Sequence, residues 1–193
     1  MRKKTQIKSI KKWEEYEGGF SELEWKNIFE LPFKTTQESK LQWIQFQILH
    51  RIFPCNYYLH RIKIIDSPIC TFCKMDFETV DHIFVECPHV KEIWYGIEEW
   101  FSQTFNRHIS FDKQAILFGK FANKNVHKVE NLIILIIKQY IYISKFSNVN
   151  KLSIEKVKKR ITDRIIVEKV LLLKNGRYNE FERHWQNIYD KLD

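Results

Sequence analysis

Four side chains with the chemistry of metal ligands fall within eighteen residues near the middle of the chain. They follow the pattern C-x2-C-x8-H-x4-C, formed by Cys70, Cys73, His82 and Cys87. Zn2+ binds thiolates and imidazoles tetrahedrally, and a tight turn between the first two cysteines would aim both sulfurs at one point. His82 and Cys87 are about one helical turn plus one residue apart, so they could converge from a short helix that ends before Pro88. Because four protein ligands leave no position for water, the spacing predicts a structural zinc site.

Other interpretations of these residues fit less well. Buried cysteines and a core histidine could meet by chance, but the joined C-x2-C and H-x4-C spacings favour a metal site. A disulfide framework is typical of exported proteins, and the N-terminus of this sequence does not resemble an export signal. The P-x-C-x-x-C sequence from Pro68 to Cys73 partly resembles a deaminase motif, but the upstream H-x-E of that site is missing. Zinc in a closed site is therefore the prediction.

Neighbouring residues have predicted supporting roles. His89 is an alternative ligand to His82, but it lies beyond the proline, whereas the x4 spacing leaves His82 and Cys87 free to turn inward. Thr79 could cap the helix that carries His82. Asp81 or Glu86 could hold the second imidazole nitrogen, because metal-bound histidines are commonly oriented in this way.

The residues around the cysteines resemble a known family: the zinc-binding region that follows the reverse transcriptase domain in the second open reading frame of LINE-type (non-LTR) retrotransposons. The resemblance spans about residues 25–188, with Cys55 where Thr is expected. The matching segments occur in the same order as in the family: Trp25–Phe33, Gln47–Pro54, Asp66–Cys73, Glu78–Cys87 with Trp94, Ile116–Gly119, Leu132–Tyr142, and Phe181 with Trp185. The resemblance implies a module that assists a polymerase in holding template RNA or target DNA.

Composition predicts an all-α fold. The chain has 193 residues, of which 15% are aromatic, and only five Gly and four Pro, which favours long helices over many short strands. We expect a multi-helix domain with an inserted CCHC zinc-knuckle-like turn-helix unit. The expected organisation is a basic N-terminal arm (1–20), a helical domain (21–105) that contains the zinc unit (66–92), and a C-terminal helical part (106–193) packed on it.

Several helix boundaries and faces can be predicted. Capping boxes at Ser21 and Thr35 would open a short helix ended by Leu31-Pro32 and a longer one that runs to Phe53. The longer helix would bury Leu41, Ile44, Ile48 and Ile52. Trp43 and Phe46 lie off this stripe, and we expect them to pack on a second face, with base stacking as the alternative.

The C-terminal half is also predicted to be helical. We expect helices from Pro88 to about Phe101, over 111–118 and over 181–192, and a buried central helix around Leu132–Ile137. A helix opened by Ser153 would place Ile154, Val157, Ile161 and Ile165 on its packed side.

Charge points to a polyanionic partner and away from the zinc unit. The net charge is +8, yet residues 66–99 hold eight acidic and two basic side chains, so this region carries −6 and the rest of the chain +14. Phosphate binding depends on cations that displace counterions. The zinc unit is therefore expected to hold helices together, while nucleic acid would contact other surfaces. The candidate contacts are Arg2, Lys3, Lys4, His50, Arg51, Arg61, Lys63, Lys156, Lys159, Arg160 and Arg164.

No catalytic constellation is visible, and we expect no enzymatic activity. A phosphate-binding G-x-x-x-x-G-K loop, a G-x-S-x-G elbow and a Tyr-x-Asp-Asp motif are all missing from the sequence. Neither a secretory signal nor a membrane span is predicted, which favours the nucleus or cytoplasm. The basic run 156–160 could act as a nuclear import signal.

The predicted function is a nucleic-acid-binding accessory module with structural Zn2+ and with RNA or DNA as partner. The alternative is a protein-interaction module that packs against the reverse transcriptase part of the same element or another protein.

Overall fold

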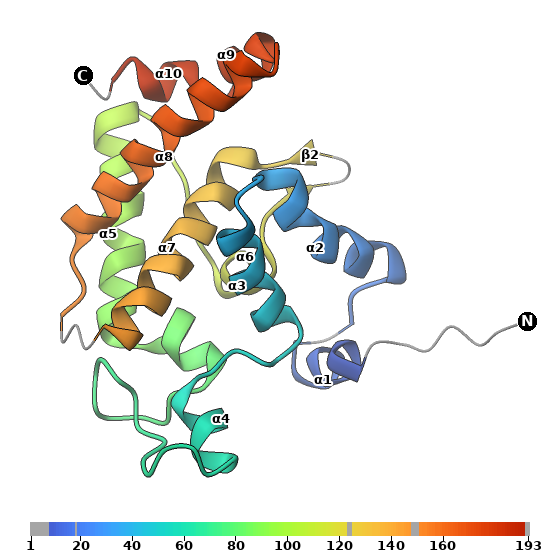
Figure 1. The fold of residues 1–193 in the computed structure, drawn as a ribbon, viewed down its shortest axis with the longest axis vertical. Helices are drawn as coiled ribbons and strands as arrows, with labels where there is room; N and C mark the ends of the chain where they lie inside the picture. Colours follow the sequence, from blue (N-terminus) through green and yellow to red (C-terminus); the bar gives the residue numbers. More distant parts are fainter. Residues whose placement is uncertain (1–7, 18, 123–124, 148–150, 192–193) are drawn as a thin grey trace, which may run out of the picture.

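The computed structural model describes residues 8–17, 19–122, 125–147 and 151–191, and these residues form an all-α protein (Figure 1). Two strands of two residues each, β1 (Phe121–Ala122) and β2 (Asn125–Val126), pair antiparallel. The helices are α1 (Lys8–Glu17), α2 (Glu22–Thr35), α3 (Ser39–Leu49), α4 (Asn56–Arg61), the π-helical turn η1 (His82–Glu86), α5 (Pro88–Phe105), α6 (Lys113–Phe118), α7 (Lys128–Phe146), α8 (Ile154–Lys174), α9 (Tyr178–His184) and α10 (Gln186–Tyr189). The predicted fold class is confirmed.

Helix α7 is the centre of the core, as its apolar run predicted. It packs against α2, α3, α8 and η1, and Leu132 to Ile137 are all buried. Within the described residues, no helix combines the length and apolarity needed to cross a membrane. Lys138 is a buried cationic residue of α7: it donates to Gln45 Oε1 at 2.5 Å, and burial lowers the pKa of its amine to about 7.

Helix α2 begins where predicted but ends later. Ser21 and Glu24 form both hydrogen bonds of the capping box. The predicted stop at Pro32 is wrong, since Pro32 lies inside the helix and is buried. Proline removes one hydrogen bond, but the Thr36 N–H donates to the Pro32 carbonyl at 3.1 Å and the helix is held by its buried face.

Helix α3 is shorter than predicted at both ends. It starts at Ser39, because Thr35 is still part of α2 and the Thr36 hydroxyl accepts from the Glu38 N–H instead. It ends at Leu49, and Arg51 has a φ of 55°, which turns the chain away before Phe53. Ile52 is consequently 43% exposed and does not join the predicted stripe.

The two aromatic residues beside that stripe do not pack on a second core face. Trp43 is 53% exposed and Phe46 is 38% exposed, whereas Leu41, Ile44 and Ile48 are buried as predicted. The expectation of packing was wrong, because the described residues leave both rings substantially exposed.

Part of the predicted N-terminal arm is folded. Trp13 of α1 is fully buried, donates to the Leu49 carbonyl at 3.0 Å and meets Phe118 edge to face. Figure 1 shows α1 beside the lower end of α3. The buried side chains on both sides of residues 20 and 105 belong to one hydrophobic cluster. The division of the chain at these positions stays a prediction.

The remaining helices follow the predictions with shifted ends. Pro88 opens α5, which continues to Phe105, and Gly119 ends α6 with a φ of 90°. A Cβ at Gly119 would lie 2.1 Å from Leu31 Cδ2, so this close approach to α2 requires glycine. The last predicted helix is divided at Trp185 into α9 and α10.

The stripe predicted for α8 is largely buried. Val157, Ile161 and Ile165 are buried and Ile154 is partly buried against the core. On the Figure 1 view, α4 and the loop that follows it lie at the end of the molecule opposite α9 and α10.

Candidate metal centre and its surroundings

The first two cysteines lie on a turn that backbone hydrogen bonds define. An isolated antiparallel bridge joins Ile69 to Phe77, and the Cys70 N–H donates to the Asp76 carbonyl at 2.8 Å. Inside the turn, the Phe72 N–H donates to Cys70 Sγ at 3.4 Å. The turn thus fixes the direction of the first ligand before any metal is bound.

The second pair of ligands is placed by a π-helical turn. The Cys87 N–H donates to the His82 carbonyl at 2.8 Å, a bond that spans five residues. In an α-helix, residues five apart would point about 140° away from each other, so the wider turn is what brings both side chains to one side. The Thr79 hydroxyl accepts from the His82 N–H at 3.0 Å, which confirms the predicted cap, and Trp94 Nε1 donates to the Phe84 carbonyl.

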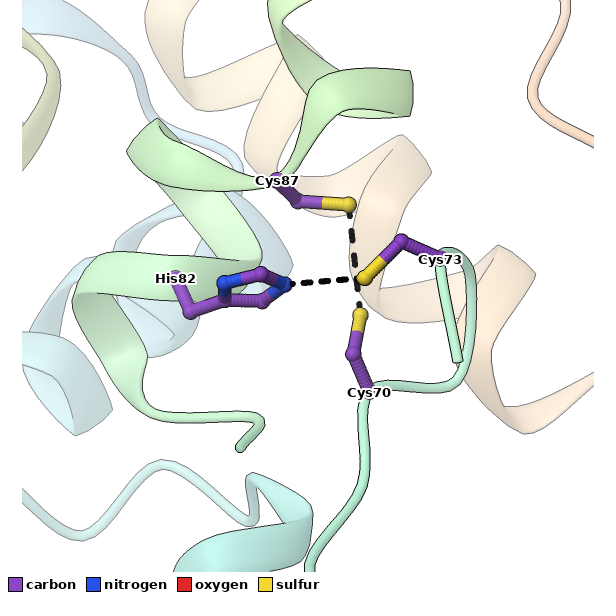
Figure 2. A group of neighbouring side chains, drawn as sticks. All are labelled: Cys70, Cys73, His82 and Cys87. Atoms are coloured by element: carbon purple, nitrogen blue, oxygen red, sulfur yellow. Dashed lines mark hydrogen bonds between the residues drawn. The ribbon is translucent and has the colours of Figure 1, made fainter. Parts of the chain in front are cut away.

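The four predicted ligands meet at one point (Figure 2). Their ligand atoms all lie within 4.8 Å of one another, with 3.9 Å between the Cys70 and Cys87 sulfurs and 3.3 Å between Cys73 Sγ and His82 Nε2. A tetrahedral Zn2+ with bonds of about 2.3 Å to sulfur and about 2.0 Å to nitrogen gives S···S separations of about 3.8 Å and S···N separations of about 3.5 Å. The donor set and its spacing therefore fit this ion.

The sulfurs of Cys70 and Cys87 share a hydrogen bond. The pKa of the Cys70 thiol is raised, first because it donates to Cys87 and then through burial, while the pKa of Cys87 is lowered because it accepts that bond. A divalent cation between them would hold both as thiolates, so binding would release protons.

The alternative arrangements do not match the geometry. A disulfide needs sulfurs about 2.05 Å apart, and all four cysteines are free. Cys55 is buried away from the cluster, at the start of α4. In the part of the chain that the structure describes, His89 does not belong to the group of converging ligands, and His82 does.

Asp81 has a different partner from the one predicted. Its carboxylate is buried and lies 3.2 Å from Lys113 Nζ of α6. This ion pair connects the start of η1 to α6. Glu86 is exposed. The role of holding the imidazole stays a prediction for both.

A buried carboxylate that sequence reasoning did not single out anchors the whole unit. Glu78 is completely buried and accepts from the backbone N–H groups of Asn56 at 2.9 Å and Thr71 at 2.7 Å. Its Oε1 also lies 2.7 Å from the ammonium of Lys145 on α7, and that ammonium donates to the Asn56 side chain. Glu78 therefore joins the start of α4, the ligand turn and the central helix. An acidic residue four positions before His82 was the signal available in the sequence.

The candidate cations near the corner after α3 are partly used within the protein. The His50 ring lies 4.0 Å from that of Phe46, and burial lowers its pKa, which favours the neutral imidazole. The Arg51 guanidinium covers the Trp13 ring at 4.4 Å. Arg61 is exposed and lies 5.5 Å above Tyr58.

An open groove of about 540 Å³ lies between α1, the α3–α4 connection and residues 79–81, which precede η1. Lys12, Arg51 and Arg61 line it together with Tyr57 and Tyr58. The buried Asp81, paired with Lys113, lies at its edge. Lys63 is exposed just after α4 with a φ of 61°. The groove combines cations and aromatic rings next to the ligand cluster.

The four candidate contacts on α8 differ in their surroundings. Lys156 is exposed and Lys159 is 3.2 Å from Asp163, but Arg160 lies over the Tyr140 ring. Arg164 was predicted as a candidate contact, but it is only 12% exposed, since its guanidinium binds Glu38, Glu168 and the Thr36 hydroxyl. These partners turn it toward α2 and α3. Arg2, Lys3 and Lys4 lie outside the described residues.

Comparison with known proteins agrees with the geometry. Residues 9–94 match a family model described as zinc-binding in reverse transcriptase. Neither the curated proteins nor the solved structures gave a match to the chain. The match begins in α1, includes the groove residues and all four ligands, and ends at Trp94, which holds the π-helical turn. Over residues 9–94, the chain is therefore similar to the zinc-binding regions of reverse transcriptases.

Proposed function

We propose that this chain is an accessory nucleic-acid-binding module in which a structural Zn2+ holds the helices around a cationic groove. Its ligand would be template RNA or target DNA of a reverse transcriptase. The observation that carries this proposal is the groove itself, where Lys12, Arg51 and Arg61 stand beside Tyr57 and Tyr58. Cations of this kind contact phosphates, and aromatic rings stack on bases.

The metal has a supporting role in this proposal. Cys70, Cys73, His82 and Cys87 would fill the coordination of Zn2+, which leaves no site for a bound water and supplies folding free energy. Three thiolates and one imidazole around the ion carry a net charge of −1, and residues 66–99 are already acidic. Phosphates are expected to contact the groove wall on the α1 and α4 side.

Binding titrations at several salt concentrations test the proposal. A labelled RNA is titrated with the zinc-loaded chain and with a Lys12→Ala/Arg61→Ala variant, and log K is plotted against log salt. Each lost phosphate contact should reduce the slope by about 0.7 for a single strand, so the double variant should lose about 1.4. A Lys91→Ala/Lys174→Ala variant, which removes two exposed charges elsewhere, is the matched control.

The outcomes separate the possibilities. No affinity for RNA or DNA, or affinity that does not depend on salt, would reject the function. An equal loss in the groove variant and in the control would mean that overall charge, and not the groove, produces binding.

A second candidate function has its own observation. Apolar side chains at the tip of the zinc unit are strongly exposed: Ile64 by 65%, Met75 by 64% and Phe77 by 57%. Surfaces of this kind commonly contact another protein, here the reverse transcriptase part of the same element. In nuclease-treated samples, purified polymerase should bind the wild-type chain, and a Met75→Ser/Phe77→Ser variant should lose that binding. Absence of any complex would remove this candidate.

A further inference from the structure

Three rings form a continuous ladder along the outer face of α3. Trp43 and Phe46 are nearly parallel, with an interplanar angle of 12° and a centroid distance of 5.2 Å. The next ring, His50, lies 4.0 Å from Phe46, and Phe29 of α2 lies beside His50 at 5.4 Å. Positions 43, 46 and 50 are three and four residues apart, so the helix itself aligns these side chains on one face.

The outer end of the ladder is open to solvent. Trp43 is 53% exposed and Phe46 is 38% exposed, although large aromatic side chains are usually buried in cores or interfaces. Their neighbours Leu41, Ile44 and Ile48 are buried on the other face of the helix. The core therefore does not require the two rings, and their exposure needs another explanation.

The charge around the ladder suits a polyanion better than a protein surface. The sequence holds no Asp or Glu between Glu38 and Asp66, while the same interval has Lys40, Arg51, Arg61 and Lys63. Lys40 precedes Trp43 by three residues and is exposed on the same side of the helix. Residues 39–65 therefore offer cations and no carboxylates to a partner, which suits a polyanion.

The ladder also leads into the groove. Its inner end, His50, is followed directly by Arg51, which lines the groove with Lys12 and Arg61. Burial lowers the pKa of His50, so that its ring is a neutral, flat surface rather than a second cation. The rings of α3 therefore end at a residue that is adjacent in sequence to one of the groove cations.

We infer that Trp43 and Phe46 form a stacking platform for unpaired bases, so that the module prefers single-stranded nucleic acid. This inference rests on the proposed function and names its ligand class. The faces of paired bases are already stacked on their neighbours within a duplex, and only an unpaired base can lay its face on an exposed ring. The groove would hold the phosphates of the same strand.

The test compares one labelled RNA as a single strand and annealed to its complement. Because one stacked base contributes roughly 1–3 kcal/mol, Trp43→Ala should weaken single-strand binding by about 5- to 150-fold. Duplex binding and the salt slope should stay unchanged, since no phosphate contact is lost. Trp43→Phe keeps a ring and should restore most of the affinity. Tyr95→Ala, which removes a 66% exposed ring from α5, is the matched control.

The results distinguish this inference from the proposed function. If the wild-type chain binds both RNAs with salt dependence but Trp43→Ala changes neither, the platform is refuted and the groove remains. An equal loss on single strand and duplex would also refute it. If the chain binds no nucleic acid, both proposals fail. Since Trp43 is exposed, an unchanged thermal midpoint of the variant will show that loss of binding is not loss of folding.

Discussion

The buried ion pair between Glu78 and Lys145 should be a main determinant of how firmly the zinc unit is attached to the core. The two side chains are 0% and 4% exposed and 2.7 Å apart. Removing one partner of such a pair leaves a buried charge without compensation, at a cost of about 3–5 kcal/mol. Lys145→Met should therefore lower the free energy of unfolding by roughly 3 kcal/mol, because the carboxylate keeps only its two backbone N–H donors.

A double-mutant cycle measures the interaction directly. Glu78→Gln and Lys145→Met are made singly and together, and unfolding in urea is followed with zinc in excess. The double variant holds no buried charge at this position, so its loss should be smaller than the sum of the two single losses by about 2 kcal/mol. The exposed pair of Lys159 and Asp163 is the control, and Lys159→Met should change the unfolding free energy by less than about 1 kcal/mol.

The same network should influence the metal. Thr71, whose N–H donates to Glu78, lies between two of the ligands, so Lys145→Met is expected to weaken zinc binding about 10- to 100-fold in competition with a chromophoric chelator. A coupling energy below about 0.5 kcal/mol, together with unchanged zinc affinity, would refute the claim that this pair anchors the unit.

Two further predictions concern the ligands and the buried lysine. The purified chain should hold one zinc ion. Cys73→Ser or a strong chelator should unfold the central region, because structural zinc contributes about 10 kcal/mol or more of apparent binding free energy. A metal-free chain with an unchanged circular dichroism spectrum and melting curve would contradict this. Burial lowers the pKa of Lys138 to about 7. Between about pH 7 and the ordinary pKa of lysine, the unfolded chain therefore binds one more proton than the folded chain, and the free energy of unfolding should rise with pH in this interval. Lys138→Met should remove about 1.4 kcal/mol per pH unit of that rise; equal slopes for both proteins between pH 7.5 and 9.5 would show that the amine is not neutral in the fold.

Local patterns in the sequence were sufficient for several features. The cysteine and histidine spacing predicted the four side chains that converge, and Ser21 with Glu24 predicted the start of α2, because each of these depends on atoms only a few residues apart. The apolar run of α7 predicted a buried helix, since burial of such a surface has few alternatives.

Other features depend on which helices meet. The attachment of Glu78 to Lys145 and the inward turn of Arg164 require α7 and α8 to lie against segments distant in the chain. Pro32 stays within α2 because packing of the buried face outweighs one lost hydrogen bond. The exposure of Trp43 is likewise set by the absence of a described helix over that side of α3.

The sequence by itself determined which cysteine and histidine side chains form one cluster, the helical class of the fold and the excess of positive charge outside the zinc unit. Tertiary structure alone decided which cations face solvent, which are bound within the protein, and where the aromatic rings of α3 stand. The physical reason is distance along the chain: capping, ligand spacing and apolar periodicity act over a few residues, whereas ion pairs and exposure are fixed only when separate helices pack.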